Sequence, residues 1–310
     1  METILLGIFI LGYLAITLEH SLKIDKLIPA LGMMALLWAL IAIFNIPVFE
    51  VDTEIRELIP TKVKKIMAYH LSHTSEILIF LLGAMTIVEI IDFYNGFEKI
   101  KSFIRTKSKK KLLWIFSILA FILSAIIDNL TATIVLITIL QKIISDKNLR
   151  LWFAGLIVIA ANAGGAWSPI GDVTTTMLWI ADKVTVPMLL YYVFIPSIVC
   201  MVVPVYIASF LKPFRGDLDK IDNDESSITK TGTTMLWLGL SAILFVPFFK
   251  VFTGLQPYVG MMLSLAIVAT FAEIYSGTKF NISTPNEDSI MHSKSPVHSA
   301  LTKIELPSIL

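Results

Sequence analysis

Apolar stretches long enough to cross a lipid bilayer recur along most of this 310-residue chain, and they constrain its fold more than any other feature. Hydrophobic residues make up 56% of the sequence and charged residues 16%. A soluble domain is about 45–50% apolar and about 25% charged. The sequence therefore predicts an all-α, polytopic membrane protein. The net charge of +1 gives no argument for a nucleic-acid partner, and a single cysteine, Cys200, cannot form an internal disulfide.

The first three membrane spans are expected at residues 4–18, 27–44 and 75–94. The stretch between the second and third spans is polar, of mixed charge, and contains two prolines that break helices. Within it, residues 51–67 are expected to form an amphipathic helix that lies in the membrane interface.

A basic loop follows the third span and sets the orientation of the chain. Residues 99–111 include seven lysines and arginines among thirteen residues, and a short loop of this kind stays on the cytoplasmic side. Residues 112–140 then carry one charge, Asp128, and basic residues follow again. A single crossing would place these two basic segments on opposite sides of the membrane. We therefore expect a re-entrant helical hairpin over residues 112–140, with its tip near Asp128 and Thr131.

The next apolar stretch, residues 151–181, is too long for one simple span and has glycines and a proline at its centre. Proline removes a backbone donor and glycine favours unwinding, so we expect a helix broken near Pro169 and Gly171. A span kinked by prolines follows at residues 186–211.

The order of these elements predicts an inverted-topology repeat. Residues 1–211 would form the first repeat, and residues 212–230 a cytoplasmic loop. Residues 231–310 would begin the second repeat in the opposite orientation, with spans at 233–249 and 257–275. We expect a further span to begin near residue 304, and this second repeat to be incomplete.

Two acidic residues, Asp128 and Asp172, interrupt apolar runs and indicate a functional site. A carboxylate at bilayer depth costs roughly 2.5–3.5 kcal/mol, so such residues are typical of ion pathways. Both lie beside amides and hydroxyls, which together suit a hard cation such as Na⁺ or Li⁺. Protons would compete with the cation for the same carboxylates, which gives antiport without a separate relay. The candidate ligands are Asp128, Asn129, Thr131, Asn162, Asp172, Thr174 and Thr175.

Each of these residues also has a structural interpretation. The two aspartates are suited to capping the N-termini of helices at the hairpin tip and at the break. The threonines are suited to bonding back to their own helices. His70 and His73 either sense pH or are solvated loop residues. The acids near the ends of the third span are expected to be interfacial: Glu76, Glu89 and Asp92.

Two long motifs carry a resemblance to a known family. They read S-A-I-I-D-N-L-T-A-T (residues 124–133) and N-A-G-G-A-W-S-P-I-G-D-V-T-T (residues 162–175). Residues 70–310 resemble the NhaD-type sodium/proton antiporters of the ion transporter superfamily, relatives of arsenite and dicarboxylate carriers. The resemblance implies extrusion of sodium and lithium in exchange for protons at alkaline pH, in a bacterial inner membrane. It also implies a homodimer and two repeats with opposed hairpins, and it assigns the same seven residues to the cation site.

Other functions are compatible with the same sequence. One is a sodium-coupled dicarboxylate or arsenite carrier of the same superfamily, although an Asp-Asn tip adds negative charge that repels anions. Another is an intramembrane aspartyl protease, since two intramembrane aspartates are present, but its paired motifs are missing. A third is a truncated chain without transport activity of its own. We expect a transporter rather than an enzyme, with the lipid bilayer and the transported ions as its partners and no bound cofactor.

Overall fold

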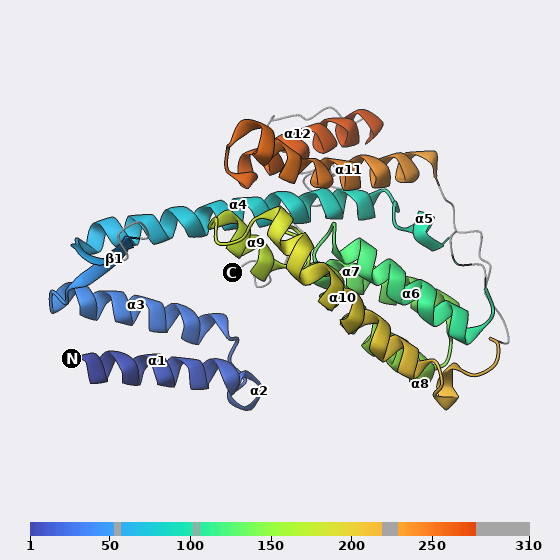
Figure 1. The fold of residues 1–310 in the computed structure, drawn as a ribbon, viewed down its shortest axis with the longest axis horizontal. Helices are drawn as coiled ribbons and strands as arrows, with labels where there is room; N and C mark the ends of the chain where they lie inside the picture. Colours follow the sequence, from blue (N-terminus) through green and yellow to red (C-terminus); the bar gives the residue numbers. More distant parts are fainter. Residues whose placement is uncertain (53–56, 102–103, 105, 219–228, 277–310) are drawn as a thin grey trace, which may run out of the picture. The chain divides into compact units, whose positions relative to one another are not determined.

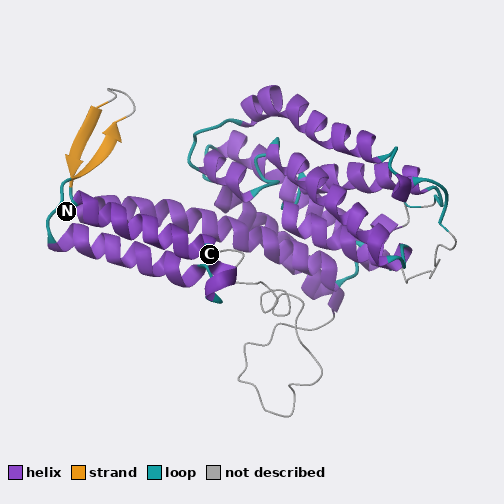
Figure 2. Ribbon diagram, turned by 90° about the horizontal axis from the view of Figure 1, so that it is seen from below, coloured by secondary structure: helices purple, strands orange, loops and turns teal. Residues whose placement is uncertain are grey.

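The computed structural model describes residues 1–52, 57–101, 104, 106–218 and 229–276. Most of the described residues lie in helices, and one two-stranded sheet is the exception (Figure 2). The chain divides into two compact units, with the boundary between Ser75 and Glu76 inside a long helix.

The first unit consists of two apolar helices, a short helix, a β-hairpin and the beginning of α4. Its elements are α1 (Glu2–Thr17), α2 (Glu19–Leu22), α3 (Leu27–Ile43), β1 (Val48–Asp52), β2 (Glu57–Thr61) and the first turns of α4 (Val63–Phe93). Helices α1 and α3 pack against each other, with Gly12 facing the side chain of Met33. None of the residues of α3 is buried, although nearly all are apolar. An apolar helix that is exposed in the protein is suited to contact with lipid.

The prediction of an amphipathic helix at residues 51–67 is wrong. This segment contains β2 and part of β1, which pair antiparallel with Phe49 opposite Pro60, and α4 begins only at Val63. Pro60 would lie in the interior of the expected helix, where its missing N–H and its ring destabilise helical backbone. β-branched and aromatic residues such as Val48 and Phe49 favour extended structure.

The second unit is an assembly of helices (Figure 1). After the end of α4 it contains α5 (Glu98–Lys101), α6 (Lys109–Ser124), α7 (Asn129–Ile143), α8 (Lys147–Ala166), α9 (Val173–Ile180), α10 (Val186–Ala208), the 3₁₀ helix η1 (Lys212–Phe214), α11 (Lys230–Thr253) and α12 (Pro257–Ser276). Helices α6, α7 and α10 all pack against α8. Three aromatic rings in contact, those of Phe116, Phe153 and Phe214, join α6, α8 and η1.

The backbone is interrupted at two places in this assembly. Helices α6 and α7 pack against each other and are joined by the short segment 125–128, in the region where the sequence predicts a hairpin. Helix α8 ends at Ala166 and α9 begins at Val173, in the region where the sequence predicts a broken helix. The two interruptions therefore fall within the two sequence motifs.

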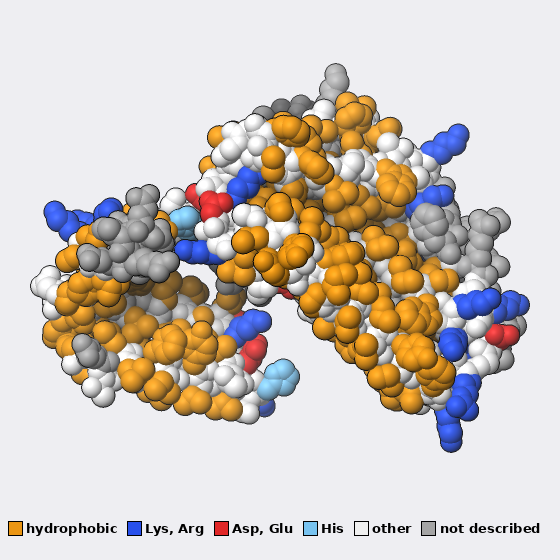
Figure 3. All heavy atoms as spheres, in the orientation of Figure 1, with side chains coloured by type: hydrophobic (Ala, Val, Ile, Leu, Met, Phe, Trp, Pro, Cys, Tyr) orange, Lys and Arg blue, Asp and Glu red, His pale blue; other side chains and the backbone are white. Residues whose placement is uncertain are grey.

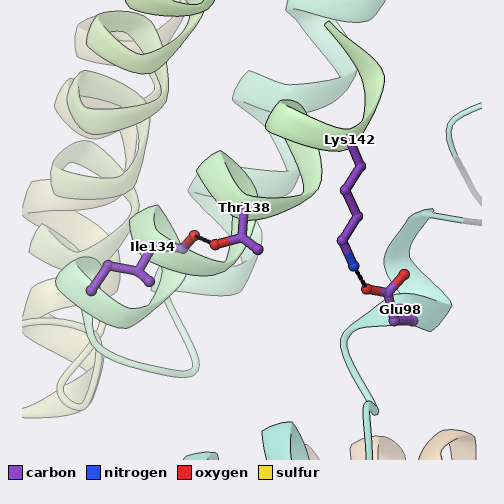
Figure 4. A network of polar contacts seen from close by, with 4 residues as sticks. All are labelled: Glu98, Ile134, Thr138 and Lys142. Carbon is purple, nitrogen blue, oxygen red and sulfur yellow. Dashed lines mark hydrogen bonds and ion pairs between the residues drawn. The ribbon is translucent and has the colours of Figure 1, made fainter. Parts of the chain in front are cut away.

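The far end of α7 is tied to α5 by an ion pair between Lys142 and Glu98 (Figure 4). One turn earlier, the Thr138 hydroxyl donates a hydrogen bond to the Ile134 carbonyl at 2.9 Å. These contacts involve the end of α7 that lies away from segment 125–128.

Helices α11 and α12 form a pair that packs on the second half of α4. The pair is joined by a turn in which Gly254 has a φ of 69°, a conformation that glycine adopts without strain. On α4, Gly83 faces Met261 and Met262 of α12. The hydroxyl of Tyr94 donates a hydrogen bond to the Ala272 carbonyl at 2.5 Å.

In the described part of the chain, four helices are long and apolar enough to cross a membrane: α8, α10, α11 and α12. Shorter apolar helices include α1, α3 and α7. These helices confirm the prediction of a multi-pass helical membrane protein. The span expected to begin near residue 304 and most of the polar segment before it lie outside the described residues, as do residues 219–228 of the loop expected at 212–230.

Candidate cation site

The first side of the candidate site is the segment between α6 and α7. Asp128 has extended backbone and caps the N-terminus of α7. Its Oδ1 accepts a hydrogen bond from the backbone N–H of Thr131 at 2.9 Å, and its Oδ2 accepts one from the Thr131 hydroxyl at 2.5 Å. An N-terminal cap satisfies donors that the helix itself leaves without partners. Thr131 is thus placed by Asp128.

The second side is the break between α8 and α9, where Asp172 caps the N-terminus of α9. Its Oδ1 accepts hydrogen bonds from the backbone N–H of Thr174, at 2.7 Å, and from the Thr174 hydroxyl. The Thr175 hydroxyl donates to the Asp172 carbonyl at 3.0 Å. The Thr176 hydroxyl donates to the Pro169 carbonyl, also at 3.0 Å. This bond joins the first turn of α9 to the non-helical segment before it. The interpretation of both aspartates as helix caps is therefore confirmed.

Two glycines, Gly164 and Gly171, allow these two sides to approach backbone to backbone, and Gly165 allows the break to pack closely on the end of α8. A Cβ atom added at Gly164 would meet the backbone of Phe121, and one at Gly171 would meet the Ser124 carbonyl and the Cα of Ala125. A Cβ at Gly165 would lie 2.5 Å from the carbonyl oxygen of Gly171. Any side chain at these positions would force the segments apart, so glycine is needed for the close contact.

A buried hydroxyl also joins the two sides. Ser168, in the break, donates a hydrogen bond to the Ala125 carbonyl at 2.5 Å. Its Oγ accepts a bond from the backbone N–H of Ile170 at 3.3 Å.

Asn129 connects the polar side chains of the two sides. Its Nδ2 donates to Oδ1 of Asn162 at 2.8 Å and to Oδ2 of Asp172 at 3.0 Å. Asn162 is held in turn by a bond from its Nδ2 to the Val158 carbonyl at 2.8 Å. Residues 33 and 43 positions apart in sequence therefore meet in one network.

The structure thus places six of the seven predicted residues in two hydrogen-bonded groups. Asn129, Asn162, Asp172 and Thr174 form the larger group, and Asp128 with Thr131 forms the smaller. The seventh, Thr175, contacts the backbone of Asp172 rather than its carboxylate. Among the described residues, no hydrogen bond joins the two groups through their side chains.

None of the seven predicted residues is buried. Asn162 and Thr174 are exposed, and the other five predicted residues are half-buried. Carboxylate, amide and hydroxyl oxygens are the ligands that hard cations use in proteins. The arrangement is therefore chemically suited to a cation that has lost part of its hydration shell.

Two polar groups next to the site were given no role by the sequence. Ser124 is fully buried at the end of α6, and its hydroxyl has no hydrogen-bond partner among the described residues. The same is true of the indole N–H of Trp167, whose ring stacks on Phe121 with centroids 6.1 Å apart and contacts Phe194 at 4.9 Å. Ser124 and Trp167 both lie inside the two sequence motifs, and this position could have indicated that they adjoin the candidate site.

A further contact fixes the opposite end of α9. The ammonium group of Lys250, on α11, donates to the carboxylate of Asp182 at 2.6 Å and to the Trp179 carbonyl at 3.2 Å. The sequence gives no sign of this contact, because 68 and 71 positions separate the partners.

The two histidines considered as pH sensors lie on α4, not in a loop. The His70 ring is 6.4 Å from that of Trp38 and 5.5 Å from that of Tyr69, and the His73 ring is 4.5 Å from that of Tyr69. They are thus remote in sequence from both motifs and belong to the first compact unit. The interpretation as loop residues is wrong, because α4 begins at Val63, earlier than expected.

The fold and the candidate site together define a multi-pass membrane protein with an oxygen-rich site between two interrupted helical segments, an arrangement typical of secondary transporters. Residues 8–282 match the sequence profile of the family described as "Citrate transporter", and the chain belongs to this family.

Similar proteins carry the name of sodium/proton antiporters. "Sodium/proton antiporter 1" of Arabidopsis thaliana is 40% identical over 263 residues, which cover 84% of this chain and 44% of that protein. "Sodium/proton antiporter 2" of the same plant is 37% identical over 86% of this chain and 61% of its own length. "Na(+)/H(+) antiporter NhaD" of Vibrio cholerae is 31% identical over 85% of this chain and 54% of its own length. The resemblance to NhaD-type proteins is confirmed, and the chain spans about half the length of these relatives.

Proposed function

We propose that this chain is a secondary active transporter that exchanges Na⁺, or Li⁺, for protons. The observation that carries the proposal is the Asn129 amide, which joins the capping carboxylate of Asp172 to Asn162 between two interrupted helical segments. The names of the similar proteins from Arabidopsis thaliana and Vibrio cholerae support the same activity.

The proposed mechanism is competition for one set of oxygen atoms. A cation entering the site is bound by the side-chain oxygens of the seven predicted residues, with the carboxylates of Asp128 and Asp172 as the charged ligands. In the absence of the cation these carboxylates hold protons, and cation binding releases them to the same side of the membrane. Exposure of the site to the two sides in turn then gives exchange.

The proposal extends to the arrangement in the membrane. Helices α6 and α7 form the re-entrant hairpin, which brings the basic residues at both of its ends to the cytoplasmic side. Helices α8 and α9 form the broken helix of a first repeat at residues 1–211, and residues 231–310 belong to a second, inverted repeat. We propose a homodimer in a bacterial inner membrane, as the resemblance implies.

A second candidate function is uptake of citrate or a similar anion, including a dicarboxylate or arsenite. The description of the family to which the chain belongs favours it. Two carboxylates at the helix starts, however, repel a carboxylate substrate at short range. This electrostatic argument is the reason for preferring a cation.

Everted membrane vesicles from a bacterium that lacks its own sodium/proton antiporters provide the test. With the 310-residue chain present, adding NaCl or LiCl should release the quenching of a pH-sensitive dye, and citrate should not accumulate. Sodium binding to the purified chain, measured with ²²Na⁺, separates ion binding from exchange. Sodium binding without exchange would support the site but exclude exchange by the 310-residue chain itself. Citrate accumulation without either effect would favour the second function.

Substitution of the two aspartates by asparagine separates ligation from capping. Asparagine caps a helix about as well as aspartate, so Asp128→Asn and Asp172→Asn keep the cap and remove the charge. Both should abolish sodium binding while the purified proteins melt at nearly the wild-type temperature. Asp146→Asn is the matched control, because Asp146 caps α8 in the same way, outside the candidate site. Normal sodium binding by both site variants would refute the proposed ligand set.

A further inference from the structure

A polar cavity lies where α6 begins and α10 ends, at the other end of α6 from the candidate cation site. Its volume is about 380 Å³, and its lining includes Ser108, Lys110, Phe210, Arg215 and Asp217. Figure 3 shows basic side chains gathered around this end of α10. This cavity belongs to the part of the protein where the sequence predicts the cytoplasmic surface.

The two basic groups of the cavity are held by their surroundings. The ammonium group of Lys110 lies 4.7 Å from the centre of the Phe210 ring. Nε and Nη2 of Arg215 donate to the Phe210 carbonyl at 3.3 and 3.2 Å. A guanidinium has five N–H donors, so most of those on Arg215 remain available to a ligand. Among the described residues of the lining, Asp217 is the one acid, and its backbone pairs with that of Ser108. The described lining therefore carries a surplus of positive charge.

An apolar groove lies on α8 next to this cavity. It has a volume of about 300 Å³ and is lined by Leu151, Trp152, Gly155, Leu156, Ile159 and Ala208. A Cβ atom added at Gly155 would meet nothing within 4 Å, so the groove is open at this residue.

The cavity and the groove adjoin each other. Ala208 lines the groove, and the following residue, Ser209, lines the cavity. The Trp152 ring of the groove is 6.5 Å from that of Phe214, which lines the cavity. The positively charged cavity thus continues into the apolar groove, which lies on the surface of α8, a helix long and apolar enough to cross a membrane.

We propose that the cavity and the groove together bind one anionic phospholipid. The phosphate of the head group contacts Lys110 and Arg215, and one acyl chain lies along the groove past Gly155. Basic pockets between membrane helices on the cytoplasmic side are suited to anionic head groups, and tryptophan is enriched at the level of the head groups. A free phosphate ion would use the cavity but leave the groove empty. This lipid site does not depend on which ion the chain transports.

The test compares lipids on the purified 310-residue chain in a mild non-ionic detergent. Native mass spectrometry counts bound lipid, and the melting temperature is recorded with phosphatidylglycerol, phosphatidylcholine or glycerol 3-phosphate. Phosphatidylglycerol should be retained as one molecule per chain and should raise the melting temperature. The other two should do neither.

Three variants and one control test the two parts of the site. Lys110→Gln and Arg215→Gln should each weaken phosphatidylglycerol binding by on the order of fivefold, the effect expected for one basic residue near a membrane surface. Gly155→Leu places a side chain in the groove, at a residue where an added Cβ meets nothing within 4 Å, and should abolish retention of the lipid. Lys147→Gln removes an exposed charge from the start of α8, outside both linings, and should leave binding unchanged.

Three results would overturn the proposal. The first is an equal loss of binding in Lys147→Gln and Lys110→Gln, which would mean general attraction by surface charge. The second is full lipid retention by Gly155→Leu. The third is an equal melting shift with glycerol 3-phosphate, which would indicate a site for soluble phosphate compounds.

Discussion

Replacing Gly164 by alanine should destabilise the protein, whereas the same change at Gly155 should not. Both glycines lie inside α8, and alanine is favoured over glycine in a helix interior by about 1 kcal/mol. The two positions differ in their surroundings. A Cβ at Gly155 meets nothing within 4 Å, whereas a Cβ at Gly164 meets the carbonyl oxygen, carbon and Cα of Phe121. Gly155→Ala is therefore the matched control for the packing at Gly164.

The size of the effect follows from these contacts. The added Cβ at Gly164 would lie 2.7 Å from the carbonyl carbon and from the Cα of Phe121. Optimal separations between carbon atoms are about 3.5–4.0 Å, so α6 must move by roughly 1 Å. Overpacking lowers the free energy of unfolding by about 1–3 kcal/mol. We expect a value at the upper end of this range, because a clash with backbone atoms cannot be relieved by a change of rotamer. We expect the free energies of unfolding of the two variants to differ by about 3 kcal/mol.

The assay is thermal melting of the purified variants followed by tryptophan fluorescence. The entropy of unfolding is about 2.1 cal/mol/K per residue, so a change of 1 kcal/mol shifts the melting temperature of a 310-residue chain by about 1.5 °C. A difference of about 5 °C between the two variants is therefore expected. Gly164→Ala should also bind ²²Na⁺ more weakly, because moving α6 displaces Asn129 from Asn162. Equal melting temperatures for the two variants would refute the close contact between the backbones of α6 and α8.

Two further predictions concern single polar contacts. Asn129→Ala should lower the affinity for ²²Na⁺ by about tenfold or more, because hydrogen bonds to charged groups contribute about 1.5–3 kcal/mol and Asn129 positions Asp172; binding at the wild-type level would contradict its role. Lys250→Met should lower the free energy of unfolding by about 1 kcal/mol, since it removes the hydrogen bond that the ammonium group donates to the Trp179 carbonyl. Asp182→Asn should lower the free energy of unfolding by less than about 0.5 kcal/mol, because the Asp182 side chain is 66% exposed and exposed ion pairs contribute little to stability. Equal melting temperatures for Lys250→Met and Asp182→Asn would contradict the importance of the carbonyl contact.

Local sequence signals predicted the two interruptions and the groups that line them. Gly171 and Pro169 favour unwound backbone, and Asp172 favours the start of a helix, so the second break could be placed within a few residues. Asp128 supplies the same signal at the start of α7. Helix breaking and helix capping depend on neighbouring residues alone, so both could be predicted from the local sequence.

Contacts between distant segments could not be predicted in the same way. The two hydrogen bonds of Asn129 depend on how α7 packs against α8, which no local pattern encodes. The cavity formed by Lys110 and Arg215 likewise depends on the meeting of α6 with the end of α10. The β-hairpin was missed because the polar segment of mixed charge was interpreted as an amphipathic helix, whereas Val48 and Phe49 favour extended structure and Pro60 disfavours a helix interior.

The close contact of the two interruptions also bears on the electric charge of the proposed cation site. Helices α6 and α8 end at the interruptions, and α7 and α9 begin there. The end of a helix carries about half a negative charge and its start about half a positive charge, so these four helix termini nearly cancel. The charge of the site then comes from the side chains that cap α7 and α9, here Asp128 and Asp172. In the proposed site, neutral caps on the same backbone would remove the negative charge that attracts a cation.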